Sequence, residues 1–305
     1  MGNVKKLGKG LDDISYLFMS SPEVNSPSKN NTVEPKKNSP AGLAATLKSI
    51  CLVGNNTGFQ DAFLVINLAL ALARLGMRIV VVDMDEGYPC LSFFLGRQIE
   101  NSEYDNPDEL IKDGPRGVKL VGLDKFILEG LSDPEKKRKI IFQLSKMEED
   151  TDLILISVNQ RNLFNISNLF KELITEFLIL VCPEKEKMLN SYKTIKTIFS
   201  LSPLAKIGII VTEVDHMYKV ELIYNKMLQA TRKFLDKELY KYGFLFKIKK
   251  EIDSKTHIAS FYDTDITACI SNIAQIVVLR LNLGDVVASA GAFFKRIITD
   301  FNRDN

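Results

Sequence analysis

The sequence contains no tryptophan, only two histidines and four cysteines among its 305 residues. The cysteines are widely spaced and form no CxxC pair, which excludes the common zinc motifs and a disulfide scaffold. Cys51, Cys182 and Cys269 lie in or beside apolar runs, so we expect them to be buried as small hydrophobes in a reducing cytosol. His216 and His257 stand in polar stretches without ligand spacing, so we expect no metal site.

A strong net charge and a long hydrophobic run are also missing. The formal net charge is +2, which gives no electrostatic case for nucleic acid as a partner. No apolar run reaches the roughly 20 residues that a membrane-spanning helix needs, and we expect no signal peptide. Hydrophobic residues make up 46% and charged residues 26%, as in ordinary soluble globular proteins. The length suits one α/β domain of about 240 residues with tails.

The stretch 49–96 carries the clearest local pattern. A short apolar run, Ile50–Val53, ends at a glycine, and Phe63–Leu75 has apolar residues at helical spacing. The β-branched run Ile79–Val82 then ends at Asp83. This order predicts a βαβ unit with parallel strands, whose ligands would sit beyond the carboxyl ends of the strands. The loop 54–62 and the pair Asp83 and Asp85 are therefore expected on one rim.

The rest of the chain alternates in the same way. Further strands are expected at 117–122, 152–157, 177–182, 207–211 and 244–248, and helices at 133–150, 188–199, 220–239 and 266–281. The stretch 99–115 is acidic and polar, and we expect it to be irregular. This alternation predicts an α/β fold with a mostly parallel, doubly wound sheet that is covered on both faces.

The segment NLALALARLGMRIVVVDMDEGYPCLSFFLG resembles the corresponding stretch of the MinD/ParA ATPases, in particular their flagellar-number-regulator branch (FlhG, also called YlxH). The resemblance covers about 48–281 and implies a P-loop NTPase fold of the MinD type. In that family a deviant P-loop, roughly SGKGGVGKT, precedes this segment and binds ATP with Mg²⁺. A gapless alignment places that loop on 54–62.

The aligned loop departs from the family pattern where chemistry is expected. The signature lysine falls on Asn56, the P-loop lysine on Asp61 and the Mg²⁺-binding threonine on Ala62. Gly58 alone keeps the place of a loop glycine, although Gly54 ends the strand. A P-loop needs glycines for close backbone approach and a lysine for the phosphates. A unit charge pair at about 4 Å and an effective dielectric near 20 is worth roughly 4 kcal/mol, so a carboxylate in place of the lysine should oppose phosphate binding.

A second element departs as well. The family's metal-contacting Asp after the fourth core strand falls on Ser157, and its adenine-reading Asn falls on Thr212. We therefore expect a degenerate nucleotide site, with no cofactor bound, or ATP with Mg²⁺ if residual activity remains. Its positions are Gly54, Gly58, Asp61, Ala62, Asp83, Asp85 and Ser157. No catalytic residue is assigned, and the chain is expected to be a pseudo-ATPase.

Residues 1–44 are expected to be a flexible tail that contains a short helix. Leu11, Ile14, Leu17 and Phe18 recur at helical spacing, next to Asp12. They loosely resemble the N-terminal activating peptide of flagellar number regulators, which implies a signal-recognition-type GTPase as the partner. The alternative is that this segment folds back on the domain, whose expected limits are 45–281.

Residues 282–305 are expected to include an amphipathic helix. One face would carry Phe293, Phe294, Ile297, Ile298 and Phe301, opposite a face that contains Lys295 and Arg296. Such a helix suits a membrane interface, and FFKRI resembles the terminal membrane-targeting helix of MinD. The alternative is a last helix packed on the core. A single copy should bind weakly, so a homodimer or a partner would add avidity.

The leading hypothesis is a MinD/FlhG-like regulator or scaffold of flagellar number or placement in a bacterium. It would be cytoplasmic, peripheral at the inner membrane and without ATP hydrolysis. Two alternatives remain open. One is an active ATPase in which Lys48 or another cation replaces the missing lysines, with Asp83 or Asp85 handling Mg²⁺ and water. The other is a ParA-like partition protein, which the near-neutral charge disfavours.

Overall fold

A computed structural model of the 305-residue chain describes residues 47–54, 59–85, 90, 111–123, 134–163, 173–248, 264–283 and 294. The N-terminal tail and its peptide, including Leu11, Asp12, Ile14, Leu17 and Phe18, lie outside these residues. So do 55–58 of the loop and all of the expected C-terminal helix except Phe294. The domain limits at 44 and 281 therefore stay predictions.

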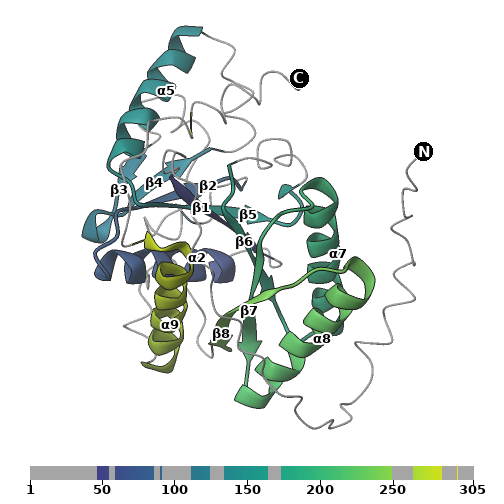
Figure 1. Ribbon diagram of the computed structural model, residues 1–305. Coiled ribbons are helices and arrows are strands. Elements are labelled where there is room, and N and C mark those ends of the chain that lie inside the picture. The colour runs from purple at the N-terminus through teal and green to yellow at the C-terminus, as the bar shows by residue number, and fades with distance from the viewer. Residues whose placement is uncertain are drawn as a thin grey trace, which may run out of the picture.

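The core is a single sheet of eight strands in the order β3-β4-β2-β5-β1-β6-β7-β8 (Figure 1). All neighbouring strands are parallel except β3, which pairs antiparallel with β4 at one edge. The strands are β1 Lys48–Gly54, β2 Ile79–Asp83, β3 Ile111–Asp113, β4 Lys119–Gly122, β5 Leu153–Asn159, β6 Glu176–Val181, β7 Ile207–Val214 and β8 Tyr240–Phe246. The predicted α/β class with a mostly parallel sheet is confirmed.

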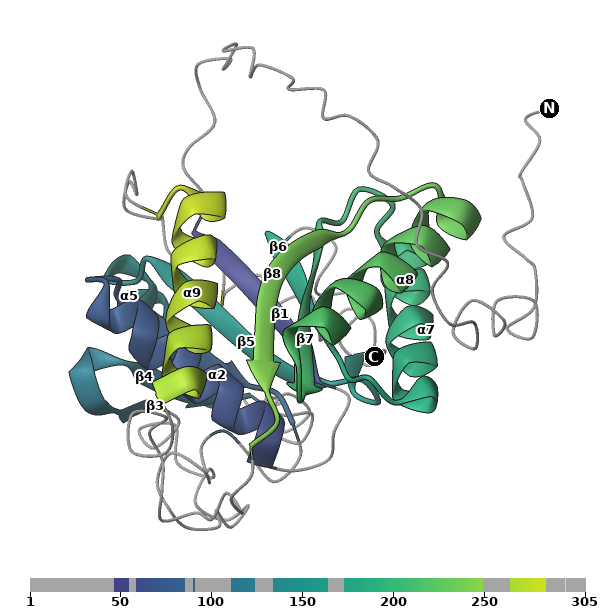
Figure 2. The same cartoon turned by 90° about the horizontal axis from the view of Figure 1, so that it is seen from below.

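The helices cover both faces of the sheet, because the chain winds in two directions from β1. The path from β1 through α2 to β2 runs toward the β3 edge, whereas β6, α7, β7, α8 and β8 run toward the other edge. Right-handed crossovers then place α2 on one face and α7 and α8 on the other. Figures 1 and 2 show α9 beside α2. The bounds are α2 Phe59–Arg74, η4 (a 3₁₀ turn) Pro115–Gly117, α5 Pro134–Glu149, α7 Lys185–Leu201, α8 Met217–Leu235 and α9 Thr264–Leu281.

Burial along the strands matches a sheet covered on two sides. Every residue of β2 and β6 is buried, and only the first residue of β1 and the last of β5 are partly exposed. Continuous apolar runs of this kind are typical of parallel sheets between helix layers. Of the described helices, α9 is long and apolar enough to cross a membrane by length and composition. Its apolar side packs on α2 and β8, as expected of a core helix.

The structure differs locally from the sequence-based expectation. Helix α2 begins at Phe59, four residues before the first apolar position of its periodic pattern. Helix α8 ends at Leu235, because Asp236 adopts a left-handed conformation with φ of 55° and caps the helix. The three-residue strand β3 lies in the polar stretch that was expected to be irregular. An edge strand this short buries little side-chain surface and leaves no hydrophobic pattern to detect.

A charged network ties α9 to the amino ends of the strands. The fully buried Glu176 of β6 accepts a hydrogen bond from the Tyr242 hydroxyl at 2.6 Å, and its other oxygen pairs with Arg280 at 2.9 Å. The Arg280 Nε also donates to the Tyr242 hydroxyl at 3.0 Å. Burial and the neighbouring carboxylate raise the pKa of Tyr242 above its usual range, so its hydroxyl stays protonated. Each of these three side chains is therefore hydrogen-bonded to the other two.

Candidate functional site

The carboxyl ends of the central strands bring the expected site residues to one rim. Asp83 of β2 stands beside Ser157 of β5, and Gly54 of β1 stands beside Asn159. The amide of Gln160 donates to the carbonyl of Gly54 at 3.1 Å and joins the loops that follow β1 and β5. The helix after β1 and the helix after β6 lie on opposite faces, so a crevice between these neighbouring strands is the expected ligand position.

The Asp61 side chain lies directly against Gly54. A Cβ atom added to Gly54 would come within 2.1 Å of the Asp61 Oδ2 and 2.6 Å of its carboxyl carbon. The carboxylate therefore covers the end of β1, where the expected phosphate loop begins. Its place in the first turn of α2 is favourable, because a helix N-terminus attracts negative charge. The Asp61 carboxylate thus places a negative charge at the helix N-terminus, where a bound phosphate would otherwise place one.

Ala62 cannot serve as a metal ligand. Its methyl group is buried in the hydrophobic core with 2% of its surface exposed. It also carries no hydroxyl, the group that the resembling family uses for Mg²⁺ at this position. The residues beside Gly54 therefore do not fit a Mg²⁺-nucleotide. Gly58 and Asn56 lie outside the described residues, and their expected roles stay predictions.

Asp83 and Asp85 hold the loops of the rim together. The Asp83 Oδ2 accepts a hydrogen bond from the Cys90 amide at 2.8 Å. The Asp85 Oδ1 accepts one from the Asn159 amide at 2.8 Å and one from the Asn162 side chain at 3.1 Å. Both carboxylates are almost fully buried. These contacts give both carboxylates a structural role in this conformation, and the handling of Mg²⁺ and water considered for them from the sequence stays a prediction.

Ser157 is buried beside Cys90. Its hydroxyl hydrogen-bonds the Cys90 thiol, whose pKa is raised well above the usual range, first by burial and then by the charge of Asp83. A serine in this contact has no carboxylate to offer a metal. In the part of the chain that the structure describes, no group of three or more His, Cys, Asp and Glu side chains could hold a metal ion.

Burial raises the pKa of Asp85 from 3.8 to about 6, although the hydrogen bonds from Asn159 and Asn162 act in the opposite direction. Because the folded pKa exceeds the unfolded one, this group favours the folded state fully below about pH 4, and that contribution is lost as the pH rises through about 6. We expect Asp85→Asn, whose Oδ1 can accept both hydrogen bonds, to raise the free energy of unfolding by about 2–3 kcal/mol near pH 7.5 and hardly at all near pH 4.

Urea unfolding of both proteins at the two pH values measures this difference. The matched control is Asp113→Asn, because the Asp113 side chain is 84% exposed. It should change the unfolding free energy by less than about 0.5 kcal/mol at either pH. An Asp85→Asn gain that is equal at both pH values would contradict the raised pKa.

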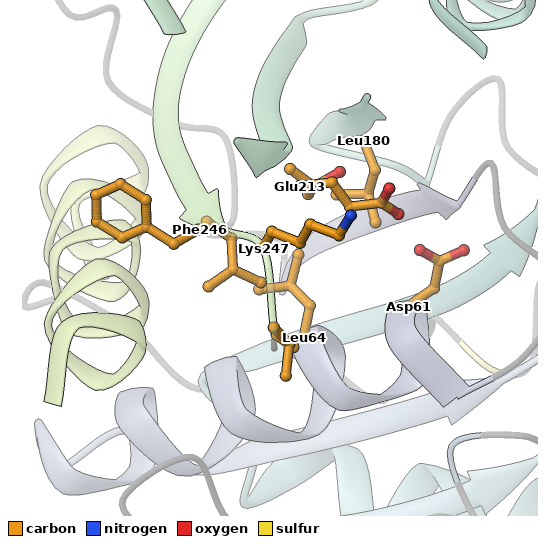
Figure 3. Close-up of a pocket in the computed structure, with 9 residues that line it drawn as sticks. Asp61, Leu64, Leu180, Glu213, Phe246 and Lys247 are labelled. Atoms are coloured by element: carbon orange, nitrogen blue, oxygen red, sulfur yellow. The ribbon is translucent and has the colours of Figure 1, made fainter. Parts of the chain in front are cut away.

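A small cavity of about 50 Å³, open to solvent, lies beside the Asp61 carboxylate at the ends of β6, β7 and β8 (Figure 3). Glu213 and Lys247 bring a second carboxylate and an ammonium group to it. Glu213 has a left-handed φ of 57°, at a register irregularity between β7 and β8. Lys187 lies 3.7 Å from the Glu213 carboxylate. The other lining residues are mainly apolar: Leu64, Leu180, Thr212, Leu245, Phe246 and Ile248.

Sequence reasoning missed Glu213 and Lys247. Glu213 is the penultimate residue of β7 and Lys247 directly follows β8. All parallel strands end on the same rim, so the position of these residues at strand ends was the signal that could have found them. The suggestion that Lys48 replaces the missing lysines is wrong. Lys48 is the first residue of β1, whereas Gly54 is the last, which puts the lysine roughly 20 Å away at the amino end of the strand.

Phe294 lies in the core, where its side chain is fully buried. Its amide donates a hydrogen bond to the buried Glu148 carboxylate of α5 at 3.3 Å. The expectation that Phe294 faces a membrane is therefore wrong for this conformation, because burial among apolar side chains takes the aromatic ring out of contact with any lipid. The other expected membrane residues lie outside the described part of the chain.

Residues 55–254 match the family model described as the CobQ/CobB/MinD/ParA nucleotide binding domain. The chain belongs to this family. The resemblance to MinD/ParA ATPases and to their flagellar-number-regulator branch is confirmed. The match includes Asp61, Asp83, Asp85 and Ser157, so the departures described above occur inside a genuine domain of the CobQ/CobB/MinD/ParA type.

Particular relatives support the assignment. The antiactivator FleN of Pseudomonas aeruginosa is 23% identical over 214 residues, which cover 67% of this chain and 75% of FleN. MinD of Aquifex aeolicus has the same fold, with a TM-score of 0.52 and 16% identity over 79% of this chain and 99% of that protein. A putative plasmid partition protein of Borrelia burgdorferi, solved with AMPPNP, also has this fold. Its TM-score is 0.51, with 15% identity over 77% of this chain and 99% of that protein.

Proposed function

We propose that this chain is a MinD/FlhG-like regulator or scaffold that acts without ATP hydrolysis, in flagellar number or placement at the cytoplasmic membrane of a bacterium. The contact between the Asp61 carboxylate and Gly54 carries the proposal. It puts a negative charge where the family needs a cation and a bare backbone. The membership of the family and the similarity to FleN supply the regulatory class.

Protein contact is the expected mode of action. FleN is named an antiactivator, a protein that acts on another protein. A chain with this fold and a blocked phosphate site keeps the surfaces of a regulator while its ligand-driven switch is absent. The N-terminal peptide, with Leu11, Ile14 and Leu17, supplies the first of these surfaces, and a signal-recognition-type GTPase is its proposed partner.

Membrane association through the C-terminal helix is the second part of the proposal. Ile298 and Phe301 follow Phe294 by four and seven residues, so in a helix they share its face. Contact of this face with lipid therefore requires Phe294 to leave the core. In the absence of a nucleotide switch, the release depends on the lipid or on a partner.

Co-sedimentation of the full chain with vesicles of phosphatidylcholine and phosphatidylglycerol, with and without Mg-ATP, tests this proposal. We expect equal binding in both conditions, because the phosphate site is blocked. The variant Ile298→Asp with Phe301→Asp should reduce binding at least about tenfold, since it places charge on the lipid-facing side. Binding that increases with Mg-ATP would show that a nucleotide switch operates and would refute the proposal.

A second candidate function, ATP binding through non-standard residues, has one observation in its favour. The Lys247 ammonium reaches the cavity beside Asp61 and Glu213, where it could offer a cation to a ligand. Two carboxylates line the same cavity and would repel a phosphate, and Ala62 still lacks a metal-binding hydroxyl. If this candidate is correct, Lys247→Ala will abolish nucleotide binding that the unaltered chain shows.

A further inference from the structure

Helix α5 carries a solvent-facing row of cations with an aromatic residue at its centre. Arg138, Phe142 and Lys146 follow one another at intervals of four residues, and all three are exposed. Lys139 is exposed beside Arg138. We refer to these four residues as the α5 stripe. Positions four apart lie on one side of a helix, so the stripe is a continuous strip of surface.

Among the described residues, the side of α5 that packs on the core is the one opposite the stripe. The buried residues of α5, including Ile140, Leu144 and Met147, lie on the other side of the helix and pack into the core. Phe142 is nevertheless 71% exposed. One exposed apolar side chain is ordinary in a soluble protein. Phe142, however, has a cation one helical turn before it, Arg138, and another one turn after it, Lys146. This combination indicates a binding surface.

We propose that the α5 stripe binds an anionic lipid surface. Lys and Arg on one face of a helix are attracted to acidic headgroups, and an aromatic side chain at the same level can enter the interface. The sequence places Lys136 and Lys137 directly before Arg138, which makes a run of four cations. The exposed Glu135 and Glu149 lie at the two ends of the helix and leave its middle positive.

The shape of the surface favours a membrane over a peptide. Protein segments commonly bind in grooves or along sheet edges. The stripe instead lies on the solvent-facing side of α5, opposite its buried residues, and Figure 1 shows this helix extending beyond the sheet. No rearrangement is needed, because the four side chains are already exposed. The stripe can therefore make a first contact while Phe294 is still buried.

The stripe also lies on the helix that contacts Phe294. Glu148, on the buried side of α5, accepts the hydrogen bond from the Phe294 amide. The inference rests on the proposed membrane association and adds a second contact surface to it. Two weak contacts on one molecule reinforce each other, since the second forms at a high effective concentration.

Vesicle co-sedimentation of the full chain can separate the two surfaces. The α5 variant is Arg138→Glu with Lys139→Glu, and its control is Lys185→Glu with Lys193→Glu, the same charge change at exposed positions of α7. Phe142→Ser is compared with Leu204→Ser, because Leu204 is 92% exposed elsewhere. On vesicles with phosphatidylglycerol, we expect a loss of about tenfold or more for the α5 variant and severalfold for Phe142→Ser. The controls should stay within about twofold.

Each outcome decides between the surfaces. An α5 variant that binds like the unaltered chain overturns the inference, even if Ile298→Asp with Phe301→Asp abolishes binding and supports the C-terminal helix. Loss in the α5 variant alone supports the stripe and refutes the C-terminal contact. Equal binding to vesicles with and without phosphatidylglycerol overturns the inference. Binding of the chain to duplex DNA or to an acidic peptide, without binding to vesicles, also overturns it.

Discussion

Replacement of Glu176 with alanine is expected to lower the free energy of unfolding by about 3 kcal/mol. The change removes a buried carboxylate that holds both the Tyr242 hydroxyl and Arg280. Arg280 then keeps its positive charge without its partner carboxylate, and its side chain is only 29% exposed to solvent. Tyr242, whose ring is fully buried, loses the acceptor for its hydroxyl. Urea denaturation followed by circular dichroism measures the loss.

A matched variant and a double-mutant cycle make this test specific. Glu221→Ala removes a surface ion pair with Lys241, where the glutamate is 60% exposed, and should cost less than about 1 kcal/mol. Tyr242→Phe should lower the free energy of unfolding by less in the Glu176→Ala background than in the unaltered protein, because the two groups share one network. Equal losses of unfolding free energy for Glu176→Ala and Glu221→Ala would contradict the network. So would losses for Glu176→Ala and Tyr242→Phe that simply add in the double variant.

The strands of the sheet could be predicted because their sequence signals are local. The apolar runs of β1, β2, β5, β6 and β7 are short, buried on both faces and bounded by turns, so periodicity and length identify them. The strand order could not be predicted in this way, because it depends on long-range pairing such as β1 with β5 and β6. Handedness rules explain the helix layers only once that order is known.

The candidate site was predictable to the extent that it depends on strand ends. Asp83 and Asp85 were expected on one rim because the parallel strands end there, and the structure brings them together with Ser157, which the family resemblance had added to the site. The contact of Asp61 with Gly54 needed the three-dimensional position of the α2 N-terminus. The inward position of Phe294 was equally hidden, since an aromatic face on a terminal helix has the same spacing whether it meets lipid or the core.

We propose that Asp61 and Ala62 together prevent nucleotide binding. Phosphate at the end of β1 would meet the Asp61 carboxylate, which already lies against Gly54. Two like charges at about 4 Å repel by roughly 4 kcal/mol at an effective dielectric of 20. A penalty of this size converts a micromolar affinity into a millimolar one. Because Ala62 is buried and lacks a hydroxyl, Mg²⁺ gains no protein ligand there that could offset the repulsion.

The most direct test is a calorimetric titration of the full chain with ATP, ADP and AMPPNP, each with and without Mg²⁺. The Borrelia plasmid partition protein that was solved with AMPPNP serves as a positive control. We predict no saturable binding to this chain up to millimolar nucleotide, and no difference when Mg²⁺ is added. Micromolar, Mg²⁺-dependent binding would contradict the assignment of Asp61 and Ala62 and would mean that a nucleotide still controls this protein.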